Sequence, residues 1–570
     1  MIFQSLISLY DRLHADGNVP PFGFSLEDIG FVITIDKEGN LIGQPEDLRT
    51  RVNTNTYEFF RSVVPYSNKV NVRARSAAKT PNFMADKADY IFGMSGSVEK
   101  KVHHDHFTKQ VQDVCQDSKD KGAMAVKCFL KKWNPKDATQ LEGWKEICGT
   151  HGKWVAFKLQ GETGFVHERS EIKELWSAHI AKESYSMGTS FVDGKMHGIQ
   201  PQYAQFKFGS GASLVSFNEK AYESYGKDRG GNAPISVEAE FKSATALKHL
   251  FRSKTQRLRI GDAATVFWTE RASFVERFMG QVLNPSPESM DAIPVQKFLE
   301  AVRAGRMPSD IEKDIDLKFY ILGLSVNKAR LALRFWHVCT VSDLVARFRD
   351  HFGNLEIEPS SEKDFLFPGI WQLLKETARE TKDISPVLGG TLTRSILTGT
   401  HYPRNLYHGV LGRIRADHRV SYLRASILKA ILQRNHKKEV PMALNTERRE
   451  VAYLLGRLFA VLEKVQLDAL GKVKATIKVR FFSAASATPA GVFPRLICLS
   501  QHHIEKSEYG YIADRRIAKI IEHIDSFPVY LNLQDRGLFA IAYYQQKNAI
   551  DREIKEAAAK KKLQKIRGGK

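Results

Sequence analysis

The chain has 570 residues, which at about 150 residues per domain allows roughly three or four domains with sizeable cores. Hydrophobic residues make up 43% and charged residues 26% of the sequence, ordinary globular usage that excludes a wholly disordered or fibrous chain. The 85 Lys and Arg against 64 Asp and Glu give a net charge of +21. Such a basic chain is expected to bind a polyanion, either nucleic acid or an anionic membrane surface.

Three features predict a cytoplasmic protein that does not enter a membrane. The sequence contains no run of 18 uncharged apolar residues, the length that a membrane-spanning helix needs. Residues 1–10 have no basic region followed by a small-residue cleavage site, so we expect no signal peptide. The 5 cysteines are scattered and include no Cys-x-x-Cys pair, which is typical of a reducing compartment.

Helix and strand signals alternate in the first half of the chain. Leu6, Leu9 and Leu13 lie at helical spacing. Apolar runs at 31–35 and 41–42, separated by a turn, predict two paired strands. The next expected elements are a helix over 111–133, a strand over 154–159, a helix over 237–251 capped by Ser236, and a strand over 264–268.

From about residue 290 the pattern becomes mostly helical. The clearest periodic stretch runs from Val451 to Val465, and we expect its helix to end at Gly471. Further helices are predicted over 512–524 and 538–563. Residues 442–570 hold 23 basic and 13 acidic side chains, a net charge of +10, and are expected to form a small helical bundle.

These patterns predict an α+β fold, with a mixed α/β N-terminal half followed by a mostly helical C-terminal half that ends in the bundle. We expect four regions in chain order. They are an α/β region with a basic loop (1–150), an α/β region with a Gly/Ser/Asn signature (151–290), a helical connecting region (291–441) and the basic helical bundle (442–570).

Catalytic and metal-binding patterns are incomplete. Gly226-Lys227 lacks the spacing of a phosphate-binding loop, because Ala221 and Asp228 stand at two of its required positions. Glu238 and Glu240 would lie about 200° apart on a helix, so we interpret them as an exposed face. The run from His103 to His106 has no second ligand pair and is interpreted as a solvated polar loop. We therefore expect no enzyme, no cofactor and no metal site.

Two loops have the composition of nucleic-acid contacts. In residues 71–82, cations can hold phosphates, and amide and hydroxyl side chains can reach base edges. A solvated loop is the alternative. The candidate residues are Asn71, Arg73, Arg75, Ser76, Lys79 and Asn82. In residues 209–232 the glycines can simply form a tight turn, and the polar residues are the candidates for function. These are Ser210, Ser213, Asn218, Tyr225, Lys227 and Asn232.

At these residues the chain resembles the large subunit of the type I-C CRISPR Cascade complex. The most specific motif is Phe208-Gly209-Ser210-Gly211-Ala212-Ser213-Leu214-Val215-Ser216-Phe217-Asn218. Shorter matches follow in family order to about residue 550. They include Ser224-Tyr225-Gly226-Lys227, Asn232-Ala233-Pro234-Ile235-Ser236, Gly261-Asp262 before Phe267-Trp268, Arg394-Ser395-Ile396-Leu397 with Tyr402-Pro403, Arg413-Ile414-Arg415-Ala416-Asp417 and Tyr543-Tyr544-Gln545-Gln546. One departure is Gln545-Gln546, where the family pattern has a His-Gln pair.

The resemblance implies a non-catalytic subunit of an RNA-guided DNA surveillance complex. Guide RNA reads most of the target, while this subunit reads a short PAM of the TTC kind in duplex DNA and helps to open the duplex. The N-terminal half would read the PAM, and the bundle, which resembles the small subunit, would line the path of the displaced strand. The implied partners are guide RNA, target DNA, the backbone, RNA-end-capping and small helical subunits, and a recruited helicase-nuclease.

A cationic groove in the bundle would suit a single strand held without sequence reading. The candidate contacts are Lys472, Lys474, Lys478, Arg480, Arg515 and Arg516, which we expect to be exposed charges. Residues 438–442 can be encoded with a ribosome-binding sequence ahead of Met442. Because type I-C systems obtain their small subunit from within the large one, the resemblance also implies an internal translation start at Met442.

Two alternatives remain open from the sequence. One is a nuclease or other nucleic-acid-processing enzyme, which incubation with DNA and Mg²⁺ or Mn²⁺ would reveal. The other is a basic RNA-binding scaffold that reads no motif, which a gel shift with motif-bearing and scrambled duplexes would separate from the first interpretation.

Overall fold

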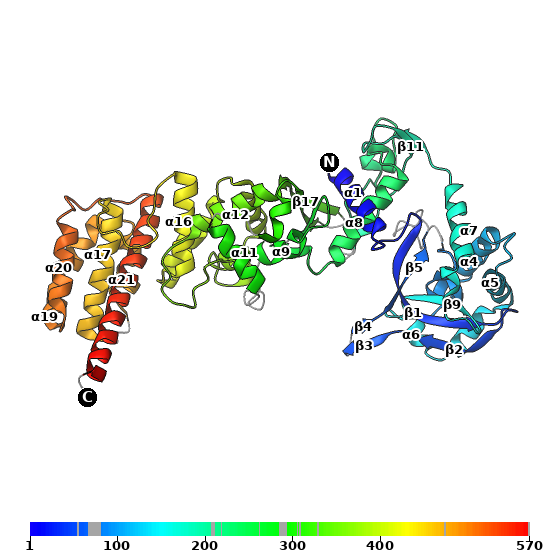
Figure 1. The fold of residues 1–570 in the computed structure, drawn as a ribbon, viewed down its shortest axis with the longest axis horizontal. Coiled ribbons are helices and arrows are strands. Elements are labelled where there is room, and N and C mark those ends of the chain that lie inside the picture. The colour runs from blue at the N-terminus through cyan, green and yellow to red at the C-terminus, as the bar shows by residue number, and fades with distance from the viewer. Residues whose placement is uncertain are drawn as a thin grey trace. The chain divides into compact units, whose positions relative to one another are not determined.

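The computed structural model describes residues 1–53, 56–66, 81–206, 211–217, 219–260, 263–283, 293–304, 306, 309–327, 330–471 and 475–567. About 51% of the chain is helical and 18% is strand, and the strands lie mainly in its N-terminal half, which confirms the α+β prediction. The chain divides into two compact units (Figure 1). Unit 1 comprises Met1–Ser253 and Val326–Ala332, and unit 2 comprises Lys254–Ser325 and Leu333–Lys570.

The sheet of unit 1 is built around the long strand β1 (Phe24–Ile35). It pairs antiparallel with β2 (Leu41–Asp47) and β5 (Phe60–Pro65), and parallel with β9 (Trp154–Leu159), which pairs antiparallel with β6 (Ala85–Asp86). The predicted strands at 31–35, 41–42 and 154–159 are thereby confirmed. Small hairpins join β3 (Thr50–Asn53) to β4 (Thr56–Glu58) and β7 (Met94–Ser95) to β8 (Val98–Glu99).

Helices pack against this sheet and share one hydrophobic core with it. They are α3 (Ala88–Ile91), α4 (Lys101–Val114), α5 (Lys121–Lys132), α6 (Trp144–Cys148) and α7 (Ser170–Ala181). The single helix expected over 111–133 is wrong. Asp120 caps a new helix, because its Oδ1 accepts the N–H of Ala123 at 2.9 Å.

The polar loop expected at 103–106 is also wrong, because these residues lie in α4. His104 is buried, and its Nδ1 lies 3.1 Å from the carbonyl oxygen of Tyr90. Burial lowers the pKa of His104. His103 faces Asp89 at 3.0 Å. Within the described residues, no three His, Cys, Asp or Glu side chains come together as a metal site would require.

The rest of unit 1 surrounds the helix α8 (Val237–Arg252), against which α1 (Ile2–Ala15) packs. Between α7 and α8 the chain forms four short strands, β10 (Met187–Thr189), β11 (Met196–Gly198), β12 (Gln205–Phe206) and β13 (Ala212–Ser213). The Ser236 cap is confirmed, since its Oγ accepts the N–H of Ala239 at 3.2 Å.

The prediction that both glutamates of α8 lie on an exposed face is wrong for one of them. Glu240 is buried, and its Oε1 accepts the backbone N–H of Ala204 at 2.7 Å. Burial raises the pKa of this carboxyl. Glu238 is exposed and pairs with Lys242 at 3.0 Å. Glu240 therefore fastens α8 to the chain that leads into β12.

Unit 2 begins with a sheet in the order β17 (Arg330–Thr340), β16 (Lys318–Asn327), β15 (Ala263–Thr269) and β14 (Arg257–Ile260). In this sheet, the strand residues up to Ser325 and those of β17 from Leu333 onward belong to unit 2. The predicted strand at 264–268 is confirmed, whereas β16 and β17 lie in a stretch expected to be mostly helical. Helices α9 (Val275–Leu283), α11 (Ile293–Arg303) and α12 (Val341–Leu355) contribute side chains to the same core.

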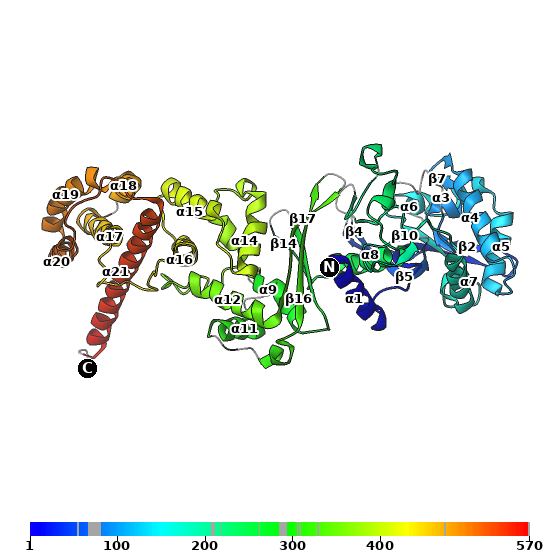
Figure 2. The same ribbon diagram turned by 90° about the horizontal axis from the view of Figure 1, so that it is seen from above.

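Nine helices of the described chain complete unit 2 after α12. They are α13 (Ile370–Lys375), α14 (Pro386–Thr398), α15 (Arg404–Asp417), α16 (Tyr422–His436), α17 (Val451–Leu470), α18 (Ile477–Ala485), α19 (Phe493–Lys506), α20 (Gly510–Ile521) and α21 (Leu533–Arg567). As predicted, α17 ends at Gly471, which has a φ of +62°. The long helix α21 lies beside α17 in both views (Figure 1 and Figure 2).

The core of unit 2 runs without a break from the sheet into the C-terminal helices. Leu454, Leu455 and Leu458 of α17 are fully buried against α21, which explains the strong apolar periodicity of this segment. Among the described helices, none is both long enough and apolar enough to cross a bilayer.

Candidate nucleic-acid interface

An exposed loop of unit 1 carries two of the predicted contact residues, Tyr225 and Lys227. Every residue from 219 to 229 is exposed. At its tip, the backbone N–H of Lys227 donates to the carbonyl oxygen of Ser224 at 2.9 Å. Tyr225 and Gly226 have φ values of +50° and +69°, the signature of a type I′ turn. This tight turn presents the ring of Tyr225, which is 98% exposed, to solvent.

The base of the loop is held in place by buried backbone contacts. Gly230 is buried and donates its N–H to the carbonyl oxygen of Pro201 at 3.0 Å. A Cβ at this glycine would lie 1.9 Å from the carbonyl oxygen of Gln200, so only glycine fits. The side-chain amide of Asn232 donates to the carbonyl oxygens of Lys227 (3.0 Å) and Arg229 (3.3 Å). Asn232 thus supports the loop from within.

The basic and acidic side chains of this loop are equal in number. Residues 219–229 hold three basic and three acidic side chains. Beside them, the guanidinium of Arg330 lies 4.3 Å from the centre of the Tyr222 ring, a cation–π contact. The loop therefore offers two exposed tyrosine rings and a few cations, a set suited to contacts with bases and backbone rather than to long-range attraction.

The structure places two further predicted contact residues in the interior. Asn82 has no exposed surface, and its backbone N–H donates to Asp86 Oδ2 at 2.7 Å. Ser213 lies in β13 and is 5% exposed. In this conformation both side chains face the interior of the protein. The remaining predicted residues of unit 1 lie outside the described residues; they are Asn71, Arg73, Arg75, Ser76, Lys79, Ser210 and Asn218.

The predicted cations of the C-terminal helices differ in exposure. Arg480 and Arg515 are exposed, and Arg516 forms an ion pair with Glu553. The expectation that Lys478 is an exposed charge is wrong. Its side chain is 20% exposed, and its Nζ lies 3.8 Å from the buried carboxylate of Glu463. Burial lowers the pKa of Lys478. Lys472 and Lys474 lie outside the described residues.

A buried Ser–His contact in unit 1 has the residue types of a catalytic pair. Ser62 Oγ lies 2.8 Å from His167 Nε2 and donates to Glu168 Oε1 at 2.8 Å. The serine proton is directed to the carboxylate, and burial lowers the pKa of His167 to about 4. Both Ser62 and His167 are buried. This geometry does not activate the serine as a nucleophile, since the base must accept its proton and a substrate must reach it.

A comparison with known protein families shows which family the chain belongs to. A family model described as CRISPR-associated protein (Cas_Csd1) matches residues 6–550. The chain belongs to this CRISPR-associated family. The match spans nearly the whole chain and supports a Cas protein of the Cascade type. A search of curated proteins returned no match.

Within this CRISPR-associated chain, the Tyr543–Gln546 motif holds the C-terminal helices together. Tyr543 donates to Glu463, and Tyr544 donates to the carbonyl oxygen of Glu358 at 2.8 Å. Gln545 accepts from Tyr453 (2.6 Å) and donates to the carbonyl oxygen of Pro441 (2.7 Å). Gln546 accepts from Arg457 at 3.1 Å. All four motif residues are buried, so this motif has a structural role here.

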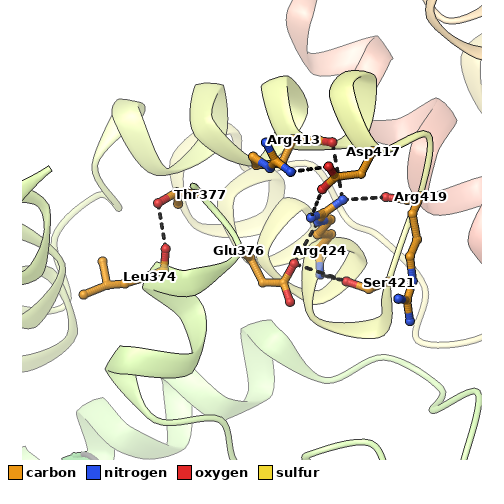
Figure 3. A network of polar contacts seen from close by, with 8 residues as sticks. All are labelled: Leu374, Glu376, Thr377, Arg413, Asp417, Arg419, Ser421 and Arg424. Atoms are coloured by element: carbon orange, nitrogen blue, oxygen red, sulfur yellow. Dashed lines mark hydrogen bonds and ion pairs between the residues drawn. The ribbon is translucent and has the colours of Figure 1, made fainter. Parts of the chain in front are cut away.

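The Arg413–Asp417 motif also belongs to an internal network (Figure 3). Arg424 on α16 is buried and bridges two carboxylates, with Nε 2.7 Å from Glu376 and an Nη 2.6 Å from Asp417. Asp417 also pairs with Arg413 within α15. Arg424 donates as well to the carbonyl oxygen of Arg419 at 2.9 Å. The network fixes α15 and α16 to each other, and sequence reasoning identified the motif without predicting this role.

Proposed function

We propose that this chain is the large subunit of a type I-C RNA-guided DNA surveillance complex. In this proposal it reads a short PAM in duplex DNA, aids opening of the duplex, holds the displaced strand and recruits a helicase-nuclease that cuts. The chain itself is non-catalytic. The family match over residues 6–550 carries the proposal, because it covers both the exposed loop of unit 1 and most of the basic C-terminal helices.

The loop at 219–229 supports the PAM-reading part. Its anchored base and type I′ turn set the backbone at Tyr225 and leave the ring exposed. Because less backbone must be ordered on binding when the turn is already formed, such a loop is suited to contact with DNA. The charge distribution supports the strand-holding part, since residues 442–570 carry +10 of the total +21.

The test uses the assembled complex with motif-bearing and scrambled duplexes. Replacing Arg73 and Arg75 with Ala should weaken binding to both duplexes and reduce its salt dependence, because phosphate contacts release counterions. Replacing Asn71 or Asn218 should instead reduce the preference for the motif, at about 1–3 kcal/mol per lost base contact. Wild-type preference and salt slope in every variant would show that other residues read the PAM.

A matched control distinguishes a lost contact from a lost fold. Asn82→Ala should lower stability, because it removes a fully buried amide beside Asp86. Any loss of DNA binding by the Asn82→Ala variant should therefore accompany a lower melting temperature. The Asn71→Ala and Asn218→Ala variants should instead lose preference for the motif at an unchanged melting temperature. Cleavage of DNA by the purified chain with Mg²⁺ or Mn²⁺ would overturn the non-catalytic assignment in favour of a nuclease.

We also propose that residues 442–570 are produced separately from the internal start at Met442. In the full chain, the carbonyl oxygen of Met442 accepts the N–H of Glu358 at 2.9 Å, and Gln545 donates to Pro441. A product starting at Met442 would lose these bonds, the packing of α16 against α21 and the hydrogen bond from Tyr544 to Glu358. It would keep the packing of α17 against α21, and on this packing we expect the separate product to fold.

A further inference from the structure

A cavity of about 290 Å³ opens among α17, α18 and α19 in unit 2. Its inner wall is apolar, since Leu462 and Leu496 are 2% and 3% exposed. Its mouth is formed by exposed side chains, among them Arg480 and Arg495. The volume is close to the lower end of small-molecule sites, about 300 Å³. The space therefore suits one small group rather than a folded partner.

The charged lining of this cavity consists of two arginines, Arg480 on α18 and Arg495 on α19. The side chains of Gln466, Ser500, His502 and His503 complete its polar lining, and none of the described lining residues is acidic. Neither arginine has an ion pair within the described chain. Two guanidinium groups at one cavity without a carboxylate repel each other, and an anion bound between them would remove that repulsion.

The apolar lining beside the arginines narrows the ligand class. Phe481 is partly buried and Leu499 is 43% exposed, and both line the cavity near its mouth. An inorganic anion would use the cations alone, whereas a nucleotide also carries, on the sugar that bears its phosphate, a flat aromatic base whose faces can pack on apolar side chains. Aromatic rings interleaved with cations are the usual means of holding single-stranded nucleic acid without reading its sequence.

We propose that this cavity binds one nucleotide unit of single-stranded nucleic acid, with the phosphate on Arg480 and Arg495 and the base against Phe481 and Leu499. The proposal rests on the proposed strand-holding function and gives it a defined site. It identifies Arg495, which the sequence did not single out, as a contact equal to Arg480.

The test measures binding of the full-length chain to a fluorescent single-stranded oligonucleotide over a range of salt concentrations. Arg480→Gln and Arg495→Gln should each weaken binding by about tenfold. Each should also reduce the slope of log K against log salt by about 0.7, the value for one phosphate contact on a single strand. Lys555→Gln is the matched control, since this exposed cation of α21 does not line the cavity.

Two further binding measurements test whether the base of the nucleotide contacts the cavity. Phe481→Leu keeps an apolar side chain and should narrow the difference in affinity between a normal strand and an abasic strand. A mononucleotide should compete with the strand better than inorganic phosphate at equal concentration. Equal competition by phosphate would overturn the nucleotide assignment.

Unchanged affinity and slope in the Arg480→Gln/Arg495→Gln double variant, with an unchanged melting temperature, would overturn the cavity as a site. This failure is distinct from failure of the proposed function. A complex that still prefers motif-bearing duplex while the double variant binds single strands normally would contradict only the cavity. A wild-type complex that binds motif-bearing and scrambled duplexes equally well would contradict the proposed function.

Discussion

Reversing the charge of Lys478 should destabilise the C-terminal helices, although by sequence it looks like a surface lysine. Its Nζ lies 3.8 Å from Glu463 Oε1, and the Glu463 side chain is only 5% exposed. Glu463 also accepts hydrogen bonds from Tyr543 and Thr476. Lys478→Glu would remove the one cation that forms an ion pair with Glu463 among the described residues and place a second carboxylate beside it.

The magnitude follows from the geometry. At 3.8 Å and an effective dielectric constant of about 20, the attraction between the two charges is about 4 kcal/mol. Removing one partner of a buried pair typically costs about 3–5 kcal/mol. Because the Lys478 side chain is 20% exposed, the new carboxylate can turn partly toward water, so we expect about 3 kcal/mol. Unit 2 has about 310 residues. At an unfolding entropy of about 2.1 cal/mol/K per residue, the loss corresponds to a fall in melting temperature of about 5 °C.

The assay is a thermal melt of the full-length chain with Arg480→Glu as the control. Arg480 lies two residues away on α18 and is exposed, so its reversal should change the free energy of unfolding by about 0.5 kcal/mol or less. Adding Glu463→Gln to Lys478→Glu should recover part of the loss, because it removes the facing charge. A Lys478→Glu variant whose melting temperature equals that of the Arg480→Glu variant would refute the reasoning.

Four further outcomes are expected. Ser236→Ala should cost about 1 kcal/mol of unfolding free energy in a denaturant titration, because it removes the cap to Ala239. Burial lowers the pKa of His351 to about 3, so its neutral form contributes stability above pH 6.5 that is lost as the pH falls toward 3. His351→Gln should therefore make the melting temperature fall less steeply over that range, and an equal slope would count against this. Tyr225→Ala should leave the melting temperature unchanged but weaken binding of the complex to motif-bearing duplex by about 1–3 kcal/mol, as for one lost base contact, and a gel shift at wild-type affinity would exclude this ring as a contact. Met442→Leu should abolish a short C-terminal product on an immunoblot while the full chain remains, and a short band that persists would exclude this start.

Local patterns in the sequence were enough to predict much of the secondary structure. The apolar period of Val451–Val465 and the glycine after it predicted α17 and its end, because both depend on the backbone of one segment. Ser236 predicted the start of α8 for the same reason. The strands β16 and β17 were missed within a stretch interpreted as helical. The signal for β16 was available in the nearly continuous apolar run at 319–326.

Burial was what the sequence left undecided. Glu240, His104 and Lys478 are polar residues on helices, and the sequence suggested that each faces water. Each is covered by a segment distant in the chain or by a neighbouring helix: Ala204 bonds to Glu240, Tyr90 to His104, and Glu463 pairs with Lys478.

The sequence by itself determined the fold class, several helices and the family, because these follow from local periodicity, capping residues and ordered motifs. The tertiary structure alone decided which polar groups lie inside, and that two arginines, one on α18 and one on α19, line the same cavity. The physical reason is that a side chain's environment is set by the packing of remote segments, which the order of residues along one helix does not specify.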